Sequence, residues 1–179
     1  MNERKVILYI SMSLDGFIAG ENDDLSFLSA MEKAGEDYGY GAFTTKVDTY
    51  IVGRKTYSKV MDMINAFPQA EQYDCYILTR QELPNQENLT FYNGDIVELI
   101  AQIRQKEGGN IYCDGGAEIV RLFMEHDLID EYIISVIPTI LGKGTRLFSG
   151  DTQSLQIKFV SEKHYDTGLV QLHYVRDRS

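Results

Sequence analysis

The stretch Asn110–Phe123, with the sequence NIYCDGGAEIVRLF, decides the fold class of this chain. A short apolar run at Ile111–Cys113 stops at a glycine pair, and apolar residues then recur at helical spacing. This pattern predicts a strand, a tight turn and a helix that packs on the sheet. Glycines allow the backbone to approach a ligand, and the free amides of a first helical turn attract anions. We therefore predict half of a phosphate-binding site for a nucleotide cofactor at Gly115, Gly116, Ala117 and Glu118.

A second junction of the same kind follows the predicted strand Thr49–Val52. The helix after it begins with Gly53-Arg54-Lys55-Thr56 and continues to about Met63. Cations at a helix N-terminus oppose the helix dipole, and a bound phosphate would relieve that repulsion. The alternative is a pair of solvated surface cations. We predict that Gly53, Arg54, Lys55 and Thr56 form the other half of the phosphate site.

A third strand, predicted at Cys75–Leu78, ends in Thr79 and Arg80. Open α/β sheets bind ligands at the carboxyl ends of their strands. Two helix N-termini together with Arg54, Lys55 and Arg80 could hold both a pyrophosphate and a separate monophosphate. This inventory favours a 2′-phosphorylated dinucleotide over an unphosphorylated one.

The rest of the chain alternates strands and helices. Asp95 suits the N-cap of a helix, and Asp166-Thr167-Gly168 the turn of a hairpin. The alternation predicts one α/β domain over residues 1–179, with a mixed, mostly parallel sheet and a C-terminal antiparallel hairpin. The further elements expected are strands at Lys5–Ser11, Leu89–Tyr92 and Glu131–Ile137, helices at Glu36–Lys46 and Asp95–Lys106, and the hairpin strands Gln156–His164 and Leu169–Arg176.

Charge and composition exclude several classes of function. The formal net charge of −10 argues against a general binder of nucleic acid or anionic membranes, which needs surplus Lys and Arg. Cys75 and Cys113 lie inside apolar runs, so we expect buried free thiols in a reducing compartment. Neither a signal peptide nor a membrane-length apolar run is visible, and we expect a cytoplasmic protein.

Other motifs for chemistry are incomplete. Gly142-Lys143-Gly144-Thr145 lacks the upstream glycine of a phosphate loop. His126, His164 and His173 are far apart and have no ligand-type neighbours, so no metal site is predicted.

Five motifs in order resemble a known family. They are Ser13-Leu14-Asp15-Gly16-Phe17-Ile18-Ala19, Gly53-Arg54-Lys55-Thr56-Tyr57, Gly115-Gly116-Ala117, Leu128-Ile129-Asp130-Glu131, and the segment from Pro138 to Phe148. Together they resemble the dihydrofolate reductase-like family. The closer likeness is to the C-terminal reductase domain of the bifunctional riboflavin-biosynthesis deaminase/reductase and its stand-alone relatives, and it spans nearly the whole chain.

The resemblance implies a three-layer α/β fold and NADPH as the hydride donor. It implies that Ser11, Ile18 and Ala19 line the nicotinamide, and that Thr79 and Arg80 lie beside the 2′-phosphate. It further implies a homodimer, with Leu128–Glu131 and Leu141–Gly144 as structural marks near the subunit contact. The alternative for Asp130 and Glu131 is that they are ordinary surface acids.

The substrate half of the site is less legible. Spacing places Asp37 near the carboxylate that protonates the pterin in dihydrofolate reductases, and burial could raise its pKa for such a role. The alternative is a solvated acid that opens a helix. Asp114 departs from the family pattern, because a carboxylate beside a pyrophosphate is repulsive unless it points away.

The function predicted is an NADPH-dependent reductase that acts on a small-molecule substrate. It would transfer hydride to a C=O or C=N bond of a heterocyclic or phosphorylated compound, as in 5-amino-6-(5-phosphoribosylamino)uracil reduction. The alternatives are dihydrofolate reduction and a non-catalytic NADPH-binding or sensor module.

Overall fold

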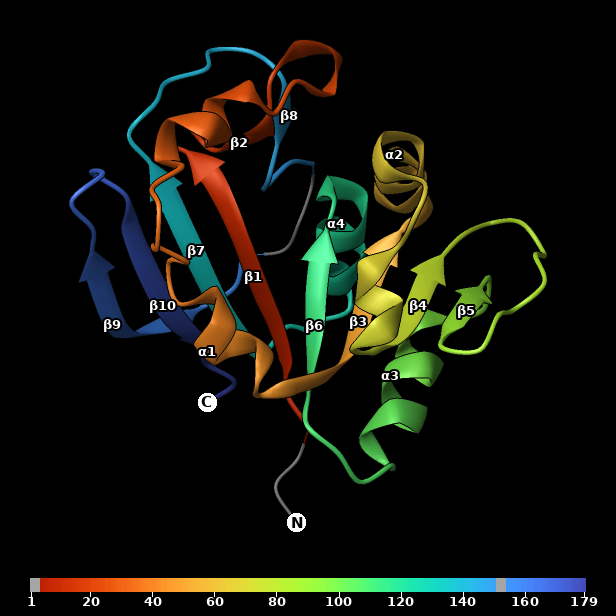
Figure 1. Cartoon of the computed structure of the whole chain (residues 1–179). Coiled ribbons are helices and arrows are strands. Elements are labelled where there is room, and N and C mark those ends of the chain that lie inside the picture. Colours follow the sequence, from red (N-terminus) through yellow and green to blue (C-terminus); the bar gives the residue numbers. More distant parts are fainter. Residues whose placement is uncertain (1–3, 151–153) are drawn as a thin grey trace.

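An eight-stranded sheet forms the centre of the computed structural model, which describes residues 4–150 and 154–179. The strand order is β5-β4-β3-β6-β1-β7-β10-β9 (Figure 1). The first six strands in that order run parallel, and β10 pairs antiparallel with both β7 and β9. The strands are β1 (Val6–Ser13), β3 (Val47–Gly53), β4 (Asp74–Leu78), β5 (Leu89–Tyr92), β6 (Asn110–Gly115), β7 (Glu131–Ile137), β9 (Ile157–His164) and β10 (Val170–Arg176). The predicted mixed, mostly parallel sheet with a C-terminal hairpin is confirmed.

Strand β1 lies inside the sheet because both of its faces are covered. Val6 and Leu8 point into one buried cluster, whereas Ile7 between them points into the other. Successive side chains of a strand alternate between faces, so a strand covered on both sides needs a continuous apolar run. This is why residues 6 to 8 read as uninterrupted hydrophobic sequence.

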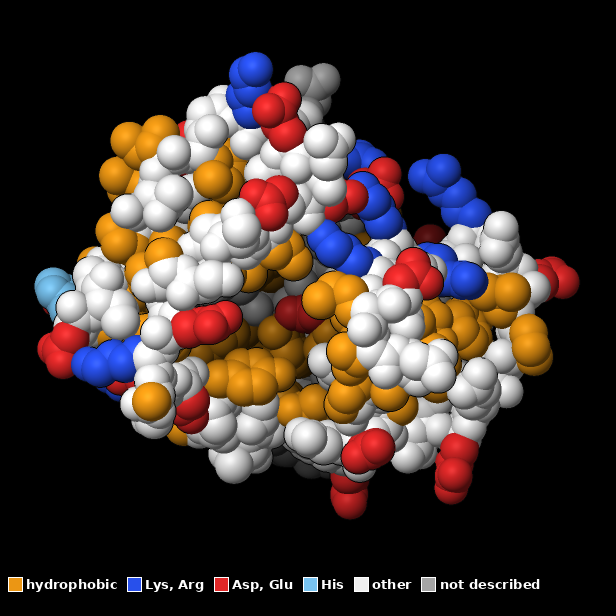
Figure 2. Space-filling view, turned by 45° about the horizontal axis from the view of Figure 1, so that its top comes forward, with side chains coloured by type: hydrophobic (Ala, Val, Ile, Leu, Met, Phe, Trp, Pro, Cys, Tyr) orange, Lys and Arg blue, Asp and Glu red, His pale blue; other side chains and the backbone are white. Residues whose placement is uncertain are grey.

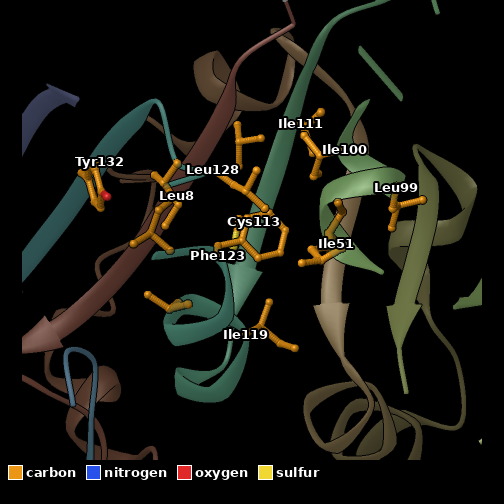
Figure 3. Packing of buried hydrophobic residues seen from close by; sticks show 14 of the residues in the cluster. Leu8, Ile51, Leu99, Ile100, Ile111, Cys113, Ile119, Phe123, Leu128 and Tyr132 are labelled. Carbon is orange, nitrogen blue, oxygen red and sulfur yellow. The ribbon is translucent and has the colours of Figure 1, made fainter. Parts of the chain in front are cut away.

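Helices cover both faces of the sheet and give three layers. Helices α3 (Ile96–Arg104) and α4 (Ala117–Glu125) cover one face, where Phe123 is fully buried beside Leu8 and Cys113 (Figure 3). Truncation of such a buried Phe typically costs about 3–5 kcal/mol. Helices α1 (Tyr40–Thr44) and α2 (Arg54–Ile64) contribute Phe43 and Tyr57 to the cluster on the other face. The three-layer arrangement is confirmed.

Helix α3 begins where its sequence signal placed it. The Asp95 carboxylate accepts the backbone N–H groups of Val97 at 2.7 Å and Glu98 at 3.0 Å. A side-chain acceptor at the N-cap satisfies amides that have no partner within the helix. Ile96, Leu99, Ile100 and Ile103 form its buried stripe at helical spacing.

The loop after β1 and the loop after β7 are tied together. Asp15 accepts backbone N–H groups from Leu141 at 3.1 Å and Gly142 at 2.7 Å, and the pKa of its carboxyl is lowered to about 2 by the Ser13 hydroxyl first and then by these backbone bonds. The same two segments also pair as a short antiparallel ribbon, β2 (Phe17–Ala19) with β8 (Thr145–Arg146). These two segments approach so closely that a Cβ at Gly144 would lie 2.0 Å from the Ala19 carbonyl oxygen.

The predicted helix Glu36–Lys46 is wrong in its extent. The helix observed there is α1, which starts at Tyr40. Tyr38 and Gly39 have φ values of 55° and 82°, so the chain cannot be helical through them. The remaining helical turns before β4 are 3₁₀ segments at Glu21–Asp23, Ser26–Met31 and Pro68–Glu71.

Two expectations on single features can be compared directly. Cys75 and Cys113 are both buried and both free, as predicted. Among the helices of the described residues, none is long and apolar enough to cross a membrane.

Candidate functional site

A cleft of about 1510 Å³ opens at the carboxyl ends of β1, β3, β4 and β6. Hydrophobic side chains lie inside the central hollow, and several Lys and Arg side chains follow its upper right rim (Figure 2). All but one of the predicted cofactor residues line this cleft, and the exception, Gly115, ends β6 directly beside it. The lining residues among them are Ser11, Ile18, Ala19, Gly53, Arg54, Lys55, Thr56, Thr79, Arg80, Gly116, Ala117 and Glu118.

Two helix N-termini meet in this cleft. Strands β3 and β6 are neighbours, with Val52 opposite Gly115, so the helices that follow them start side by side. A Cβ on Gly116 would lie 3.6 Å from Thr56 Oγ1, and one on Gly53 would lie 2.9 Å from Ile119 Cγ1. The approach requires glycine at Gly53, where a Cβ would collide with the Ile119 side chain, whereas a Cβ at Gly116 would make an ordinary van der Waals contact.

Neither of these helices has a side-chain N-cap within the described residues. Gly53 and Gly116 occupy the cap positions of α2 and α4, whereas α3 is capped by the Asp95 side chain. The first amides of α2 and α4 are left without the partner that α3 has. Such amides, together with the helix dipole, form an anion site.

Arg54 is held in place by its neighbours and keeps one donor unused. Its Nε donates to Ser58 Oγ at 3.0 Å, and its guanidinium lies 5.8 Å and 5.7 Å from the ring centres of Tyr57 and Phe91. Its Nη1 is buried and has no hydrogen-bond partner among the described residues. Buried donors are nearly always bonded, so this nitrogen fits an acceptor that a ligand brings.

Two lysines of α2 reach a loop on the opposite side of the cleft. Lys55 Nζ lies 2.8 Å from Asp23 Oδ2, and Lys59 donates to the Asp23 carbonyl oxygen. Lys55 is 80% exposed, so this ion pair contributes little stability and can exchange for another anion.

Thr79 and Arg80 follow β4 directly at the cleft. Thr79 Oγ1 accepts the backbone N–H of Gln81 at 3.1 Å, which tightens the turn, and Arg80 is exposed. The structure thus brings both residues to the same cleft as the two helix N-termini.

A second cavity of about 650 Å³ adjoins the cleft. The two share the lining residues Tyr9, Ser11, Leu28 and Tyr40. Ser11, predicted at the nicotinamide, therefore lies at the junction. Asp37, predicted for the substrate side, lines the second cavity.

A proton-donor role for Asp37 required burial that raises the pKa of its carboxyl, and the structure contradicts this. Its carboxylate is exposed and accepts the backbone N–H groups of Gly39 at 2.8 Å and Gly41 at 3.0 Å. These two bonds lower its pKa below the ordinary value. Asp37 therefore stays ionised near neutral pH, and the prediction of a catalytic role is wrong. Its carboxylate is instead a hydrogen-bond acceptor that shapes the turn before α1.

Asp114 is a carboxyl group whose pKa is shifted in the opposite direction, and the sequence pattern did not single it out as a candidate for proton transfer. It lines the cleft, and its oxygens accept hydrogen bonds from the hydroxyls of Tyr50 and of Tyr112, the latter at 2.6 Å. Burial raises the pKa of this carboxyl, although the two hydrogen bonds act against the shift.

The placement of Asp114 follows from the strand period. Tyr112 and Asp114 lie two residues apart on one face of β6, and Tyr50 is opposite Tyr112 on β3. The carboxyl thereby lies on the sheet face of Tyr50 and Tyr112, opposite to the face against which α4 packs. This period-two signal was available in the sequence.

Asp130 and Glu131 make contacts with several other segments of the chain. Asp130 accepts from the backbone N–H of Val6 at 2.8 Å and from Arg104 and Arg178 at 2.7 Å each. Glu131 contacts Lys5 Nζ at 2.6 Å and His173 Nε2 at 3.0 Å. The surface-acid alternative does not hold for either residue.

Across the described ranges 4–150 and 154–179, no group of three His, Cys, Asp or Glu side chains is arranged to hold a metal ion.

Comparison with known proteins places the fold. The model of the RibD C-terminal domain matches residues 4–171. The chain is 42% identical to "Uncharacterized protein YwjB" of Bacillus subtilis over 175 residues, which covers 97% of this chain and 99% of that protein. A structure titled "Putative riboflavin biosynthesis protein" from Shewanella sp. PV-4 has a TM-score of 0.86 at 29% identity, with coverage of 97% and 99%.

A more distant likeness supports the same fold. Dihydrofolate reductase from Enterococcus faecalis, solved in complex with NADP(H), has a TM-score of 0.68 at 15% identity and covers 97% of this chain and 96% of its own. The fold is therefore dihydrofolate reductase-like, as the motifs implied. From the match over nearly its whole length, the chain belongs to the RibD C-terminal domain family.

Proposed function

We propose that this chain is an NADPH-dependent reductase that transfers hydride to a C=O or C=N bond of a small heterocyclic or phosphorylated substrate. Support comes from membership of the RibD C-terminal domain family. A similarly folded chain from Thermotoga maritima, 14% identical with a TM-score of 0.73, is titled a deaminase and 5-amino-6-(5-phosphoribosylamino)uracil reductase. This chain covers 57% of that protein.

The observation that carries the proposal is the pair of uncapped helix N-termini beside one buried guanidinium nitrogen, Arg54 Nη1, that has no partner among the described residues. The amides at Gly53–Thr56 and Gly115–Glu118 would bind the pyrophosphate, and Arg54 Nη1 would find its acceptor there. Arg80, with Thr79, would bind the 2′-phosphate at the end of β4.

The nicotinamide would lie where the cleft meets the second cavity. Ser11 lines both, and Ile18 and Ala19 line the cleft beside it. Bound NADPH would supply the hydride. The protein would orient the ring against a substrate in the second cavity and exclude water with the aromatic side chains Tyr9 and Tyr40.

Asp114 would provide the proton that must accompany a hydride to a neutral C=O or C=N bond. Burial raises its pKa, which shifts the carboxyl toward the protonated form that general-acid catalysis needs. Its two tyrosine partners hold the group in one orientation. Asp114 also lies close to Tyr40 of the shared wall, whose pKa is raised to about 12 chiefly by burial and also by neighbouring Tyr73 and Asp114.

The experiment is a pair of titrations followed by a turnover assay. NADPH and NADH are titrated against the protein while nicotinamide fluorescence is recorded, and tight binding of NADPH is expected. NADPH oxidation is then followed with dihydrofolate, the phosphoribosylaminopyrimidine and a panel of cyclic imines and ketones. No binding of either cofactor would refute the proposal, whereas binding without any turnover would favour a non-catalytic NADPH-binding module.

We also propose that the protein forms a homodimer. Strand β9 is an edge strand, and its side chains Ile157, Phe159 and Val160 are exposed by 42%, 56% and 47%. Exposed apolar edge strands favour pairing with another chain. Light scattering should give twice the 20.4 kDa mass of the chain, and a monomer at micromolar concentration would refute the dimer.

A further inference from the structure

The second cavity, called here the acidic cavity, is defined by a polar floor and a charged rim. Ser135 and Ile137 of β7 form part of its floor and are 2% and 1% exposed. Leu28, Met31 and Leu169 add an apolar wall. The cavity joins the cofactor cleft through Tyr9, Ser11, Leu28 and Tyr40, so in the proposed reductase it is the substrate site.

The charge of the acidic cavity is opposite to that of the cofactor cleft. Glu32, Glu36 and Asp37 line it, and Lys33 is the one basic side chain among the described residues that do so. Lys33 is already paired with Asp166 at 3.0 Å. Lys163 lies nearby, but it packs over the Tyr165 ring at 4.5 Å and is not part of the lining.

Two of the three carboxylates, those of Glu36 and Asp37, are held by the turn that carries them. Glu36 Oε1 accepts the backbone N–H of Tyr38 at 2.9 Å, and Asp37 binds the amides of Gly39 and Gly41. Tyr38 anchors this turn to the sheet, because its carbonyl oxygen accepts from Tyr9 at 2.9 Å and from Gln171 at 3.1 Å. The negative charge is therefore a built feature of the rim and not a pair of mobile side chains.

Aromatic rings complete the wall. Tyr9 stacks on Phe43 with ring centres 4.4 Å apart and meets Tyr40 edge-on at 5.8 Å. Tyr38 also lines the cavity. Aromatic faces attract cations and accept flat rings, and their attraction adds to that of the carboxylates.

We infer that the acidic cavity takes a cationic, unphosphorylated nitrogen heterocycle, such as a protonated cyclic imine. The inference rests on the proposed function. A phosphate ester needs Arg or Lys donors, and the only such donor among the described lining residues is Lys33, which is already paired with Asp166; the ester would also meet the negative charge of three lining carboxylates. A C=N⁺ group would be attracted to the same surface.

The chemistry balances for such a substrate. Hydride from the reduced nicotinamide would form a C–H bond at the C=N⁺ carbon while the nicotinamide is oxidised. The π-electron pair would move to the nitrogen and neutralise its charge, leaving an amine. The proton already on the nitrogen would come from Asp114 or solvent before hydride addition.

Three probes of similar size test the inference by binding alone. They are N-methyl-3,4-dihydroisoquinolinium as the cation, 1-tetralone as the neutral ring and phenyl phosphate as the anion. Dissociation constants are measured by calorimetry, with and without 1,4,5,6-tetrahydro-NADPH, an unreactive reduced cofactor analogue. The cation is expected to bind at least tenfold more tightly than the neutral ring, and phenyl phosphate more weakly than both.

The matched variants are Glu36→Gln and Glu87→Gln. The first keeps the acceptor for Tyr38 N–H and removes only the charge, so the preference for the cation over the neutral ring should fall at least threefold. The second removes an exposed charge that lines neither cavity and should change nothing.

Tighter binding of phenyl phosphate than of the neutral ring would overturn the inference, and so would an unchanged preference in Glu36→Gln. These outcomes are separable from failure of the proposed function, which would appear as no binding of the cofactor analogue. The order of the three probes without cofactor still decides the inference in that case.

Discussion

Replacement of Arg80 by Ala tests the assignment of the cofactor's 2′-phosphate. Arg80 is exposed at the end of β4 and lines the cleft, so its removal leaves no buried group unpaired. A hydrogen bond to a charged group is worth about 1.5–3 kcal/mol, and about 1.4 kcal/mol corresponds to a tenfold change in affinity. Solvent screening places an exposed arginine at the lower end. NADPH binding should therefore weaken about tenfold.

The same variant should bind NADH with less than a twofold change, because NADH has no 2′-phosphate for Arg80 to hold. The assay is a fluorescence titration of both cofactors against wild type and Arg80→Ala at about 50 mM and 200 mM salt. The NADPH difference should shrink at the higher salt, since screening weakens exposed charge pairs. Equal losses for NADPH and NADH would show that the phosphate lies elsewhere in the cleft.

Three further changes can be predicted from the structure. Asp95→Ala removes the cap of α3, which should cost about 1 kcal/mol and lower the melting temperature by about 2–4 °C in calorimetry, and no shift would show that the cap is replaceable. Asp23→Asn frees Lys55 from its ion pair, so NADPH should bind up to about fivefold more tightly, and weaker binding would show that Asp23 itself supports the site. Asp114→Asn should reduce kcat about 10²- to 10⁴-fold with cofactor affinity unchanged, and an unchanged kcat would refute the proton-donor role. The wild-type rate should fall as pH rises through the raised pKa of Asp114, and the variant should lose that dependence. The free energy of unfolding should change with pH in the same direction as the rate. A pKa that is raised in the folded state stabilises the fold at pH values below the unfolded-state pKa, and this contribution is lost as pH rises through the folded-state pKa.

Local sequence signals were sufficient for most of the elements. Asp95 followed by helical periodicity predicted α3, and Asp166-Thr167-Gly168 predicted the hairpin of β9 and β10. They failed between Asp37 and Tyr40, where left-handed residues delay the helix. Such conformations depend on contacts with distant residues, here Gln171 and Tyr9 against the Tyr38 carbonyl oxygen.

The two carboxylates show where reasoning from spacing stopped. Asp37 and Asp114 each looked ambiguous along the chain, since a carboxylate has no fixed pKa until its surroundings are known. The fold exposes Asp37 to water and to two backbone amides, whereas it encloses Asp114 between tyrosines of two strands. The difference lies in the folded surroundings, because the chain leaves Asp37 at the surface and buries Asp114 beside Tyr50 of another strand.

The sequence by itself determined the strand–glycine–helix junctions at Gly53 and Gly115, because backbone freedom and helical periodicity are properties of neighbouring residues. Only the tertiary structure decided that these junctions meet in one cleft and that a cavity of opposite charge adjoins it. The physical reason is the strand order, which puts β3 beside β6 and β6 beside β1 although they are separated along the chain. Charge and burial at a site are sums over such neighbours, and no local pattern contains them.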